Sequence, residues 1–271
     1  MRAWLCRLAG MILAVVLCAG LPGCAKQPGG SGAALSPTDG ALAGGSDLEE
    51  GGMQPHMNRE QKMLALTFDD GPSSYTTEIL DVLERNNARA TFFCLGSRAE
   101  EYEKTLRRAA ALGCEIASHS YAHKRLSELS GTALAEDLRM ARDALEANSG
   151  REIRLMRTPY GQHEKELIRK IDMPVVLWDI DTLDWTYGIH ETGFSAEEFE
   201  YARRKVVQEV LDHAEDGDIV LMHDLYAVTA AAAKEVIALL AREGWQLVTV
   251  SELFAAKEKS LEAGKYYCSA R

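Results

Sequence analysis

An apolar stretch runs directly into two adjacent aspartates in the segment LALTFDDGP, residues 64–72. Neighbouring carboxylates repel each other, and a fold tolerates them side by side where a cation or a proton lies between them. Gly71 and Pro72 follow at once and are typical of a tight turn. Asp69 and Asp70 are therefore either polar residues of that turn or the acidic part of a cation-binding or acid–base site.

A second cluster lies in HSYAH, where His119 and His123 are four positions apart. This spacing places both imidazoles on the same side of a helical turn. Two imidazoles and one carboxylate leave a position open for water, which is the composition of a catalytic zinc site. A pair of this spacing is as often structural as metal-binding when it stands alone. With the aspartate pair, one of Asp69 and Asp70 would bind the metal and the other would act as a general base on the bound water.

Short apolar runs alternate with amphipathic stretches from residue 62 onward. We expect strands at 63–68, 90–96, 114–118, 153–157, 174–180, 217–223 and 245–250, and helices at 75–87, 98–112, 131–148, 163–170, 196–214 and 228–243. Continuous apolar strands between helices are typical of a parallel sheet that helices cover. The pattern predicts an α/β fold, a distorted and incomplete (β/α) barrel with about seven parallel strands.

The reactive residues of β/α barrels lie at the carboxyl ends of the strands. Asp69, Asp70 and His119 occupy such positions, and four further polar residues do so as well, namely Arg157, Asp181, Asp184 and His223. Separate segments would thus deliver carboxylates, imidazoles and a guanidinium to one rim of the barrel.

Five motifs occur in the order TFDDGP, HSYAH, RTPYG, DTLDW and LMHD. Together they resemble the motifs of the polysaccharide deacetylases, the NodB-homology domain of carbohydrate esterase family four, over about residues 60–257. The resemblance implies a metal-dependent hydrolase that removes N-acetyl groups from a glycan and releases acetate. The metal would be Zn²⁺, with Co²⁺, Ni²⁺ or Mn²⁺ as alternatives.

The resemblance also implies a role for individual residues. Three would hold the metal, namely Asp70, His119 and His123. Asp69 would be the catalytic base, and Arg157 would hold it ionised and oriented. The backbone N–H of Tyr160 would stabilise the oxyanion, and Pro159 would fix that turn beside the substrate pocket.

On the other side of the site, His223 would protonate the leaving amine. Asp184 would orient His223 and raise its pKa. Trp185 and Leu221 would form an apolar pocket for the acetyl methyl group. The stretch 186–205 is longer than is usual in the family, and it is either a surface loop leading into a helix or a flap that shapes substrate binding.

The amino terminus has the composition of a secretory signal, because Arg2 and Arg7 border an apolar run too short to span a bilayer comfortably. The run ends in LPGC, which resembles a bacterial lipobox with Cys24 as the lipidated residue. An ordinary signal peptide and an uncleaved anchor are the alternatives. We expect a leader at 1–23, a flexible Gly/Ser/Pro linker at 24–60, a catalytic domain at 61–257 and a tail at 258–271.

Charge and cysteine content limit the partners. The formal net charge of −11 argues against a nucleic-acid partner. Only three cysteines lie beyond the leader and its Cys24, so no disulfide framework is expected. Cys94 and Cys114 are interpreted as buried thiols, with a bridge between them as the lesser alternative.

A lipoprotein on the outer face of a bacterial membrane would meet peptidoglycan, so peptidoglycan GlcNAc or MurNAc, or a chitin-like oligomer, is the preferred substrate of an expected monomer. Alternatives are an O-deacetylase of acetyl-xylan or another acetylated polysaccharide, a catalytically silent glycan-binding lipoprotein of the same fold, and a structural or spore-coat protein.

Overall fold

The computed structural model describes residues 57–271. The predicted leader, Cys24 and most of the predicted linker lie outside the described residues. Within residues 57–271, no helix has the length and apolar character needed to cross a membrane. Met57 is already buried and belongs to a hydrophobic cluster.

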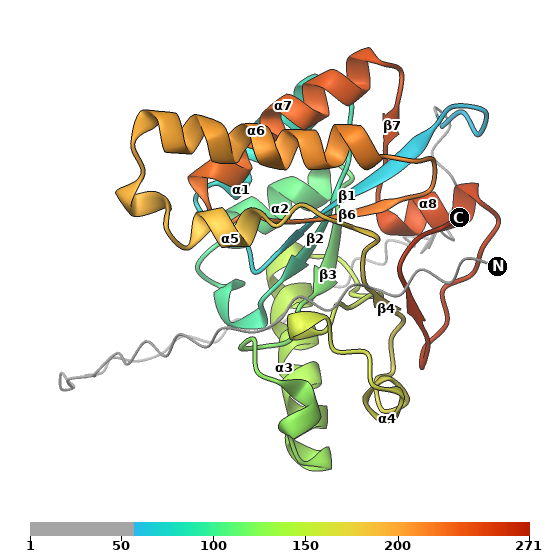
Figure 1. Ribbon diagram of the computed structural model, residues 1–271. Helices are drawn as coiled ribbons and strands as arrows, with labels where there is room; N and C mark the ends of the chain where they lie inside the picture. Colours follow the sequence, from blue (N-terminus) through green and yellow to red (C-terminus); the bar gives the residue numbers. More distant parts are fainter. Residues whose placement is uncertain (1–56) are drawn as a thin grey trace, which may run out of the picture. The chain divides into compact units, whose positions relative to one another are not determined.

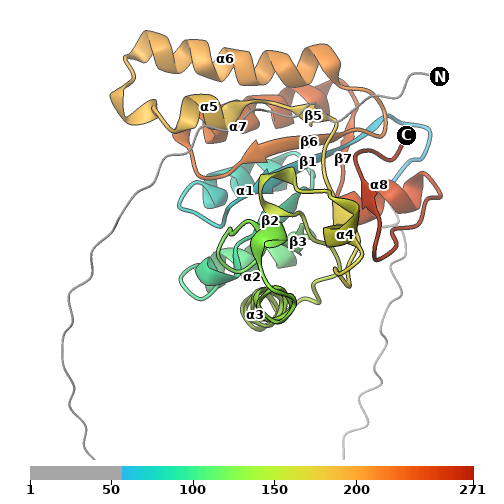
Figure 2. The ribbon, with the colours of Figure 1, turned by 60° about the horizontal axis from the view of Figure 1, so that its bottom comes forward.

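Five parallel strands form the main sheet in the order β3, β2, β1, β6, β5 (Figure 1, with β5 labelled in Figure 2). They are β1 (Met63–Asp69), β2 (Thr91–Cys94), β3 (Glu115–Ser118), β5 (Ile180–Asp181) and β6 (Ile219–His223). Strand β7 (Gln246–Leu247) pairs with the first residues of β1, and β4 (Val175–Val176) pairs with β8 (Tyr266–Tyr267). Single bridges through Met156 connect β3 to β4. No pairing among the described strands joins β5 to β8, so the sheet is an open α/β barrel, as predicted.

Helices cover the outer face of the sheet. The long ones are α1 (Thr76–Arg85), α2 (Glu103–Ala111), α3 (Gly131–Ser149), α6 (Ala196–His213) and α7 (Ala227–Arg242). Helices α6 and α7 lie side by side, and Figure 2 shows α3 nearly end-on beside α2. Shorter helices are α4 (Lys165–Ile168), α5 (Asp184–Gly188) and α8 (Val250–Ala256), with 3₁₀ turns at Gly96–Arg98, Leu126–Glu128, Pro159–Gly161 and Glu191–Gly193. A capping box of Ser195 and Glu198 starts α6, because these side chains bind the backbone N–H groups that the first turn leaves unpaired.

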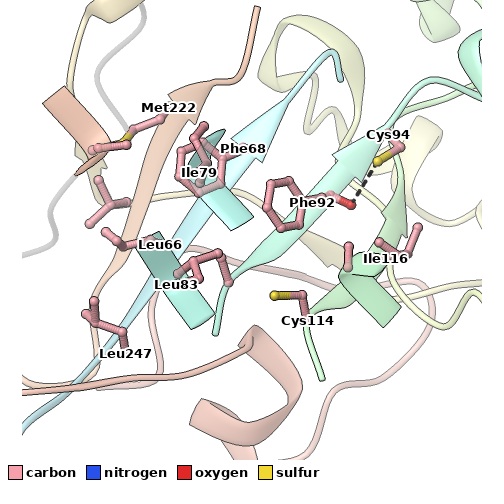
Figure 3. Packing of buried hydrophobic residues seen from close by; sticks show 14 of the residues in the cluster. Leu66, Phe68, Ile79, Leu83, Phe92, Cys94, Cys114, Ile116, Met222 and Leu247 are labelled. Carbon is pink, nitrogen blue, oxygen red and sulfur yellow. Dashed lines mark hydrogen bonds between the residues drawn. The ribbon is translucent and has the colours of Figure 1, made fainter. Parts of the chain in front are cut away.

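The alternation of side chains along β1 separates two hydrophobic clusters. Leu64, Leu66 and Phe68 pack against the helices, whereas Met63 and Ala65 face the interior of the barrel. In Figure 3, Phe68 lies beside Phe92 of β2, with the ring centroids 5.2 Å apart. The inward row continues through Thr67 to Asp69, so the strand period itself places this carboxylate inside the barrel mouth.

Three predicted strands are wrong in extent. The one at 245–250 is reduced to β7, and its last residue, Val250, begins helix α8. The stretch 153–157 contributes only the two isolated bridges of Met156, and 174–180 is divided between β4 and β5. The guanidinium of Arg157 explains the break, because its Nε and Nη2 donate to the carbonyls of Val176 and Leu177 at 2.9 and 2.8 Å. A buried side chain thus takes over backbone acceptors at the point where the predicted strand stops.

The thiols of Cys94 and Cys114 are free and buried, which confirms the first interpretation and excludes a bridge between them (Figure 3). The Sγ of Cys94 lies 3.6 Å from the carbonyl oxygen of Phe92. Burial raises the pKa of the Cys114 thiol to about 11. Both cysteines therefore serve as small apolar core residues.

The C-terminal segment packs against the amino-terminal end of the sheet. The N–H of Ala270 donates to the carbonyl of Gly217 at 2.8 Å, just before β6. The guanidinium of Arg271 lies 2.9 Å from Asp179 and 3.0 Å from Asp218. Burial and the neighbouring Asp218 raise the pKa of Asp179 to about 8. Arg271 thus offsets the repulsion between two carboxylates.

Replacing Arg271 with Ala is expected to lower the free energy of unfolding by about 1 kcal/mol, since the guanidinium is partly exposed. An acid whose pKa is raised by folding stabilises the protein fully below its ordinary value of 3.8 and loses that contribution as the pH rises through about 8. At pH 8.5 Asp179 carries the charge that Arg271 balances, and at pH 5 it does not. The loss of stability in R271A should therefore be larger at pH 8.5 than at pH 5. Urea unfolding at both pH values measures it, with the exposed Arg169→Ala as control, and equal deficits would contradict the account.

Candidate active site

Arg157 lies fully buried in the barrel interior and binds Asp69. Its Nη1 donates to Asp69 Oδ1 at 2.7 Å and to Thr67 Oγ1 at 2.8 Å. The ring of Phe93 lies 4.1 Å from the guanidinium carbon. Burial lowers the pKa of Arg157, and the adjacent Asp69 opposes this shift. The arrangement fixes one carboxylate oxygen of Asp69 and leaves the other, Oδ2, 3.9 Å from His119 Nε2.

Asp70, His119 and His123 converge on one point. Asp70 Oδ1 lies 3.2 Å from His123 Nε2 and 3.4 Å from His119 Nε2, and one donor atom from each residue lies within 4.8 Å of the others. His119 Nδ1 lies 2.9 Å from the carbonyl oxygen of Arg157. A carbonyl only accepts, so Nδ1 carries the proton and the lone pair of Nε2 is directed toward Asp70.

This set fits a divalent metal ion. The Asp70 oxygen Oδ1 is buried and has no hydrogen-bond partner in the described residues. An unpaired carboxylate oxygen in a buried place is costly, and a cation between it and two imidazoles would satisfy it. Burial raises the pKa of Asp70, but the imidazoles of His119 and His123 outweigh it, so the carboxylate form is favoured. One carboxylate and two imidazoles are the ligands of a metal centre with an open position.

The histidine pair lies in a loop and not on a helical turn, which corrects the basis of the prediction. Ser120 and His123 both have positive φ, 68° and 52°, and the N–H of His123 donates to Ser120 Oγ at 3.0 Å. Asp137 of α3 accepts from the N–H of Tyr121 at 2.9 Å. Asp70 also has a positive φ, of 69°. Such left-handed residues cluster at functional sites, where surrounding contacts hold them.

His223 and Asp184 form the opposite side of the site. His223 Nδ1 lies 2.9 Å from Asp184 Oδ1, and Asp184 Oδ2 accepts from the N–H of His223 at 2.7 Å and from Thr229 Oγ1 at 2.7 Å. Burial lowers the pKa of His223, but the charge and hydrogen bond of Asp184, with Asp70 and Asp69, outweigh it and raise the pKa to about 10. The imidazole is therefore protonated at neutral pH.

The predicted pocket residues lie around these groups. Leu221 is buried on β6, in register with Thr67 of the inward row. Trp185 is half-buried in the first turn of α5, and its backbone N–H donates to Asp184 Oδ1. Tyr160 is exposed, its ring meets that of His123 edge-on at 4.6 Å, and its φ is 61°. Pro159 is buried in the same 3₁₀ turn.

The long stretch 186–205 is anchored beside the pair His223 and Asp184. Both carboxylate oxygens of Glu191 accept from backbone N–H groups at the start of α7, those of Ala227 and Val228, at 3.0 Å each. Gly188 lies so close to the ring of Tyr226 that a Cβ there would overlap it. Glu191 thus caps a helix that lacks a local cap, which favours the anchored loop over a freely opening flap.

Sequence reasoning missed Asp224, the last residue of LMHD. It is fully buried, and its Oδ2 accepts from Thr76 Oγ1. Burial raises the pKa of Asp224 to about 7. The signal was present, since an aspartate directly after an apolar strand is rarely buried without a role, but the sequence did not show what it would contact.

Comparison with known proteins decides the family. The polysaccharide deacetylase family profile matches residues 56–174. The peptidoglycan-N-acetylmuramic acid deacetylase PdaC of Bacillus subtilis is 40% identical over 200 residues, which are 73% of this chain and 40% of that protein. Its solved structure superposes with a TM-score of 0.68 and 38% identity, covering 74% of this chain and 94% of the solved chain. This chain belongs to the polysaccharide deacetylase family.

Two further relatives of this family differ in what they are named for. The peptidoglycan-N-acetylglucosamine deacetylase PgdA of Listeria monocytogenes is 36% identical over 210 residues, 77% of this chain and 42% of that protein. The Xyl-CE4 domain of a multidomain xylanase from the hindgut metagenome of Trinervitermes trinervoides has a TM-score of 0.68 and 32% identity, covering 78% of this chain and 98% of the domain. The chain spans about two fifths of the length of the curated peptidoglycan deacetylases. Membership confirms the resemblance drawn from the five motifs.

Proposed function

We propose that this protein is a metal-dependent hydrolase that removes N-acetyl groups from a cell-wall glycan and releases acetate. One observation carries the proposal. Three side chains that could hold a metal share one rim of the barrel with a carboxylate held by a buried arginine and an imidazole held by a buried carboxylate. An amide needs an activated water on one side and a proton for its nitrogen on the other, and this arrangement offers both.

Asp70, His119 and His123 would hold the metal, which we propose to be Zn²⁺. When bound, it polarises the acetyl carbonyl and lowers the pKa of a bound water. Asp69 accepts the proton of the attacking water, and Arg157 holds that carboxylate in place through its Nη1. The backbone N–H of Tyr160 donates to the oxyanion.

His223 donates a proton to the leaving nitrogen. The hydrogen bond between Nδ1 and Asp184 leaves Nε2 as the donor that faces the substrate, and the raised pKa keeps it protonated. The base, Asp69, ends β1, and the acid, His223, ends β6. The two strands pair with these residues in register, so the two side chains act on the same acetamide. Leu221, Trp185 and Pro159 would exclude water around the acetyl methyl group.

Peptidoglycan is the proposed substrate, because PdaC and PgdA are named for its N-acetylmuramic acid and N-acetylglucosamine. An acetylated xylan is the second candidate, since the similar Xyl-CE4 domain comes from a xylanase. The same machinery serves both, because an ester needs less help for its leaving group than an amide.

Acetate release by the full-length chain in detergent tests the function. We expect release from peptidoglycan that stops on chelation, returns with zinc and is absent in His119→Ala. Acetyl-xylan and chitin oligomers serve as competing substrates that rank the two candidates. Zinc binding without acetate release from any of the three would favour a glycan-binding protein instead.

We propose that Cys24 is lipidated and anchors a monomeric protein to the outer face of the membrane. Its place after an apolar run and before a Gly/Ser/Pro-rich stretch supports this. Expression in a bacterium fed labelled fatty acid should label the wild-type chain, and Cys24→Ser should remain unlabelled and leave the membrane fraction. Equal labelling of both would refute the anchor.

A further inference from the structure

Asp224 links the strand that carries the proposed acid to the turn that follows the proposed metal ligand. Its carboxylate oxygen Oδ2 accepts from Thr76 Oγ1, and its backbone carbonyl accepts from Ser73 Oγ. The N–H of Ser73 in turn donates to Thr76 Oγ1 at 2.8 Å. All three residues are buried, so these bonds form one closed network between the end of β6 and the start of α1.

The other carboxylate oxygen of Asp224 lies against Gly71. That oxygen, Oδ1, is buried and has no hydrogen-bond partner in residues 57–271. A Cβ added to Gly71 would overlap the carboxylate, so only glycine fits beneath it. In addition, the carbonyl of Gly71 accepts from the N–H of Leu95 at 2.9 Å. Gly71 is thus clamped between Asp224 and the residue that follows β2.

This clamp acts on the neighbour of Gly71, Asp70, whose φ of 69° is one that an L-residue adopts only where its surroundings hold it. Asp70 Oδ1 lies 3.4 Å from His119 Nε2 and 3.2 Å from His123 Nε2, and the three donors converge only while it stays there. A change of backbone angle at Asp70 would swing that oxygen away from His119 and His123.

We propose that Asp224 is a positioning residue that fixes the Asp70–Gly71 turn and thereby sets the affinity of the metal centre. The inference rests on the metal centre of the proposed function and adds a residue that contacts neither metal nor substrate. Contacts that orient a metal ligand typically change metal affinity 10–100-fold when they are removed.

The test is the zinc dissociation constant of the full-length chain, measured by competition with a chromophoric chelator. Asp224→Ala should weaken zinc binding by about 10–100-fold. Asp224→Asn should restore most of the affinity, because the amide oxygen still accepts from Thr76 and the side-chain volume is unchanged. Thr76→Val removes the hydroxyl that donates to Asp224 and accepts from the N–H of Ser73, and it leaves the Asp224 side chain in place, so it should weaken binding in the same direction by a smaller factor. It replaces Asp224→Ala if that variant does not fold.

Glu115→Ala supplies the matched control. Glu115 is a partly buried carboxylate at the other end of the sheet, where it accepts from Thr91 Oγ1 and from Ser251. This variant should lose stability in urea and bind zinc as tightly as the unaltered chain.

Zinc binding by Asp224→Ala or Thr76→Val that equals that of the unaltered chain would overturn the inference. Equal weakening in Glu115→Ala would overturn it too, since the effect would then be general destabilisation. Failure of the unaltered chain to bind zinc would instead refute the metal centre itself, which separates the two ideas.

Discussion

Replacing Asp69 with Asn is expected to lower kcat by about 10²–10⁴-fold, the contribution typical of a general base, while zinc still binds. Asn has the same volume and keeps an oxygen that can accept from Arg157 Nη1. Its amide cannot take up a proton from water. Asp69 is not among the three converging donors, so the proposed metal set of Asp70, His119 and His123 stays intact.

The same variant separates catalysis from stability. Arg157 is fully buried, and in D69N it keeps its hydrogen bonds but loses its counter-charge. The free energy of unfolding should therefore fall, because an uncompensated buried charge is costly. Urea unfolding and zinc binding measured beside acetate release show that the activity loss belongs to folded, metal-loaded protein.

Asp216→Asn is the control for D69N. Asp216 accepts from the N–H of Met63 at 2.8 Å, at the amino-terminal end of β1 and away from the site. This variant should keep its full kcat. Activity of D69N within a few-fold of the unaltered chain would show that another group accepts the proton.

The sequence was sufficient wherever a periodic pattern fixes a position. Period-two alternation along β1 sends Asp69 inward, and parallel pairing places His223 beside it, so two distant motifs meet at one rim. The parallel order of the strands then brings the ends of β2 and β3 to the same edge. Residues at strand ends were therefore predictable, as was the open barrel.

Contacts between side chains and backbone were not predictable in this way. The pattern at 174–180 is that of one strand, but the Arg157 guanidinium competes for its carbonyls and divides it. The spacing of His119 and His123 indicates a helical turn, but Ser120 in a left-handed conformation turns the segment into a loop. Such outcomes depend on which distant side chain arrives, and a single sequence does not record that.

The second large effect is expected from Asp184→Asn, in the pH profile. Asp184 is the first of the carboxylates that raise the pKa of His223 to about 10, ahead of Asp70 and Asp69, so removal of its negative charge should lower that pKa. In the proposed mechanism, the acid form of His223 protonates the leaving amine. The alkaline limb of kcat/KM should therefore move to lower pH by about 1–3 units, the usual effect of one adjacent charge. A profile of acetate release against pH measures it.

The pH dependence of the free energy of unfolding reports the charge on His223 independently of catalysis. A histidine whose pKa is raised by folding stabilises the protein fully below its ordinary value of 6.5, and this contribution is lost as the pH rises through about 10. The deficit of D184N in urea unfolding should thus be largest at pH 6 and shrink toward pH 10. Thr229→Val, which removes a neutral hydroxyl bound to the same carboxylate, should lower stability without this pH dependence.

The two readings together decide what His223 does. A shift of the alkaline limb that matches the shrinking stability deficit would assign both to one imidazole, the proton donor. If the stability deficit depended on pH while the alkaline limb stayed in place, His223 would be charged but would not be the group that limits the reaction. The proton for the leaving nitrogen would then have to come from another residue of the rim, and Asp181, whose pKa is raised by burial, would be the first to replace.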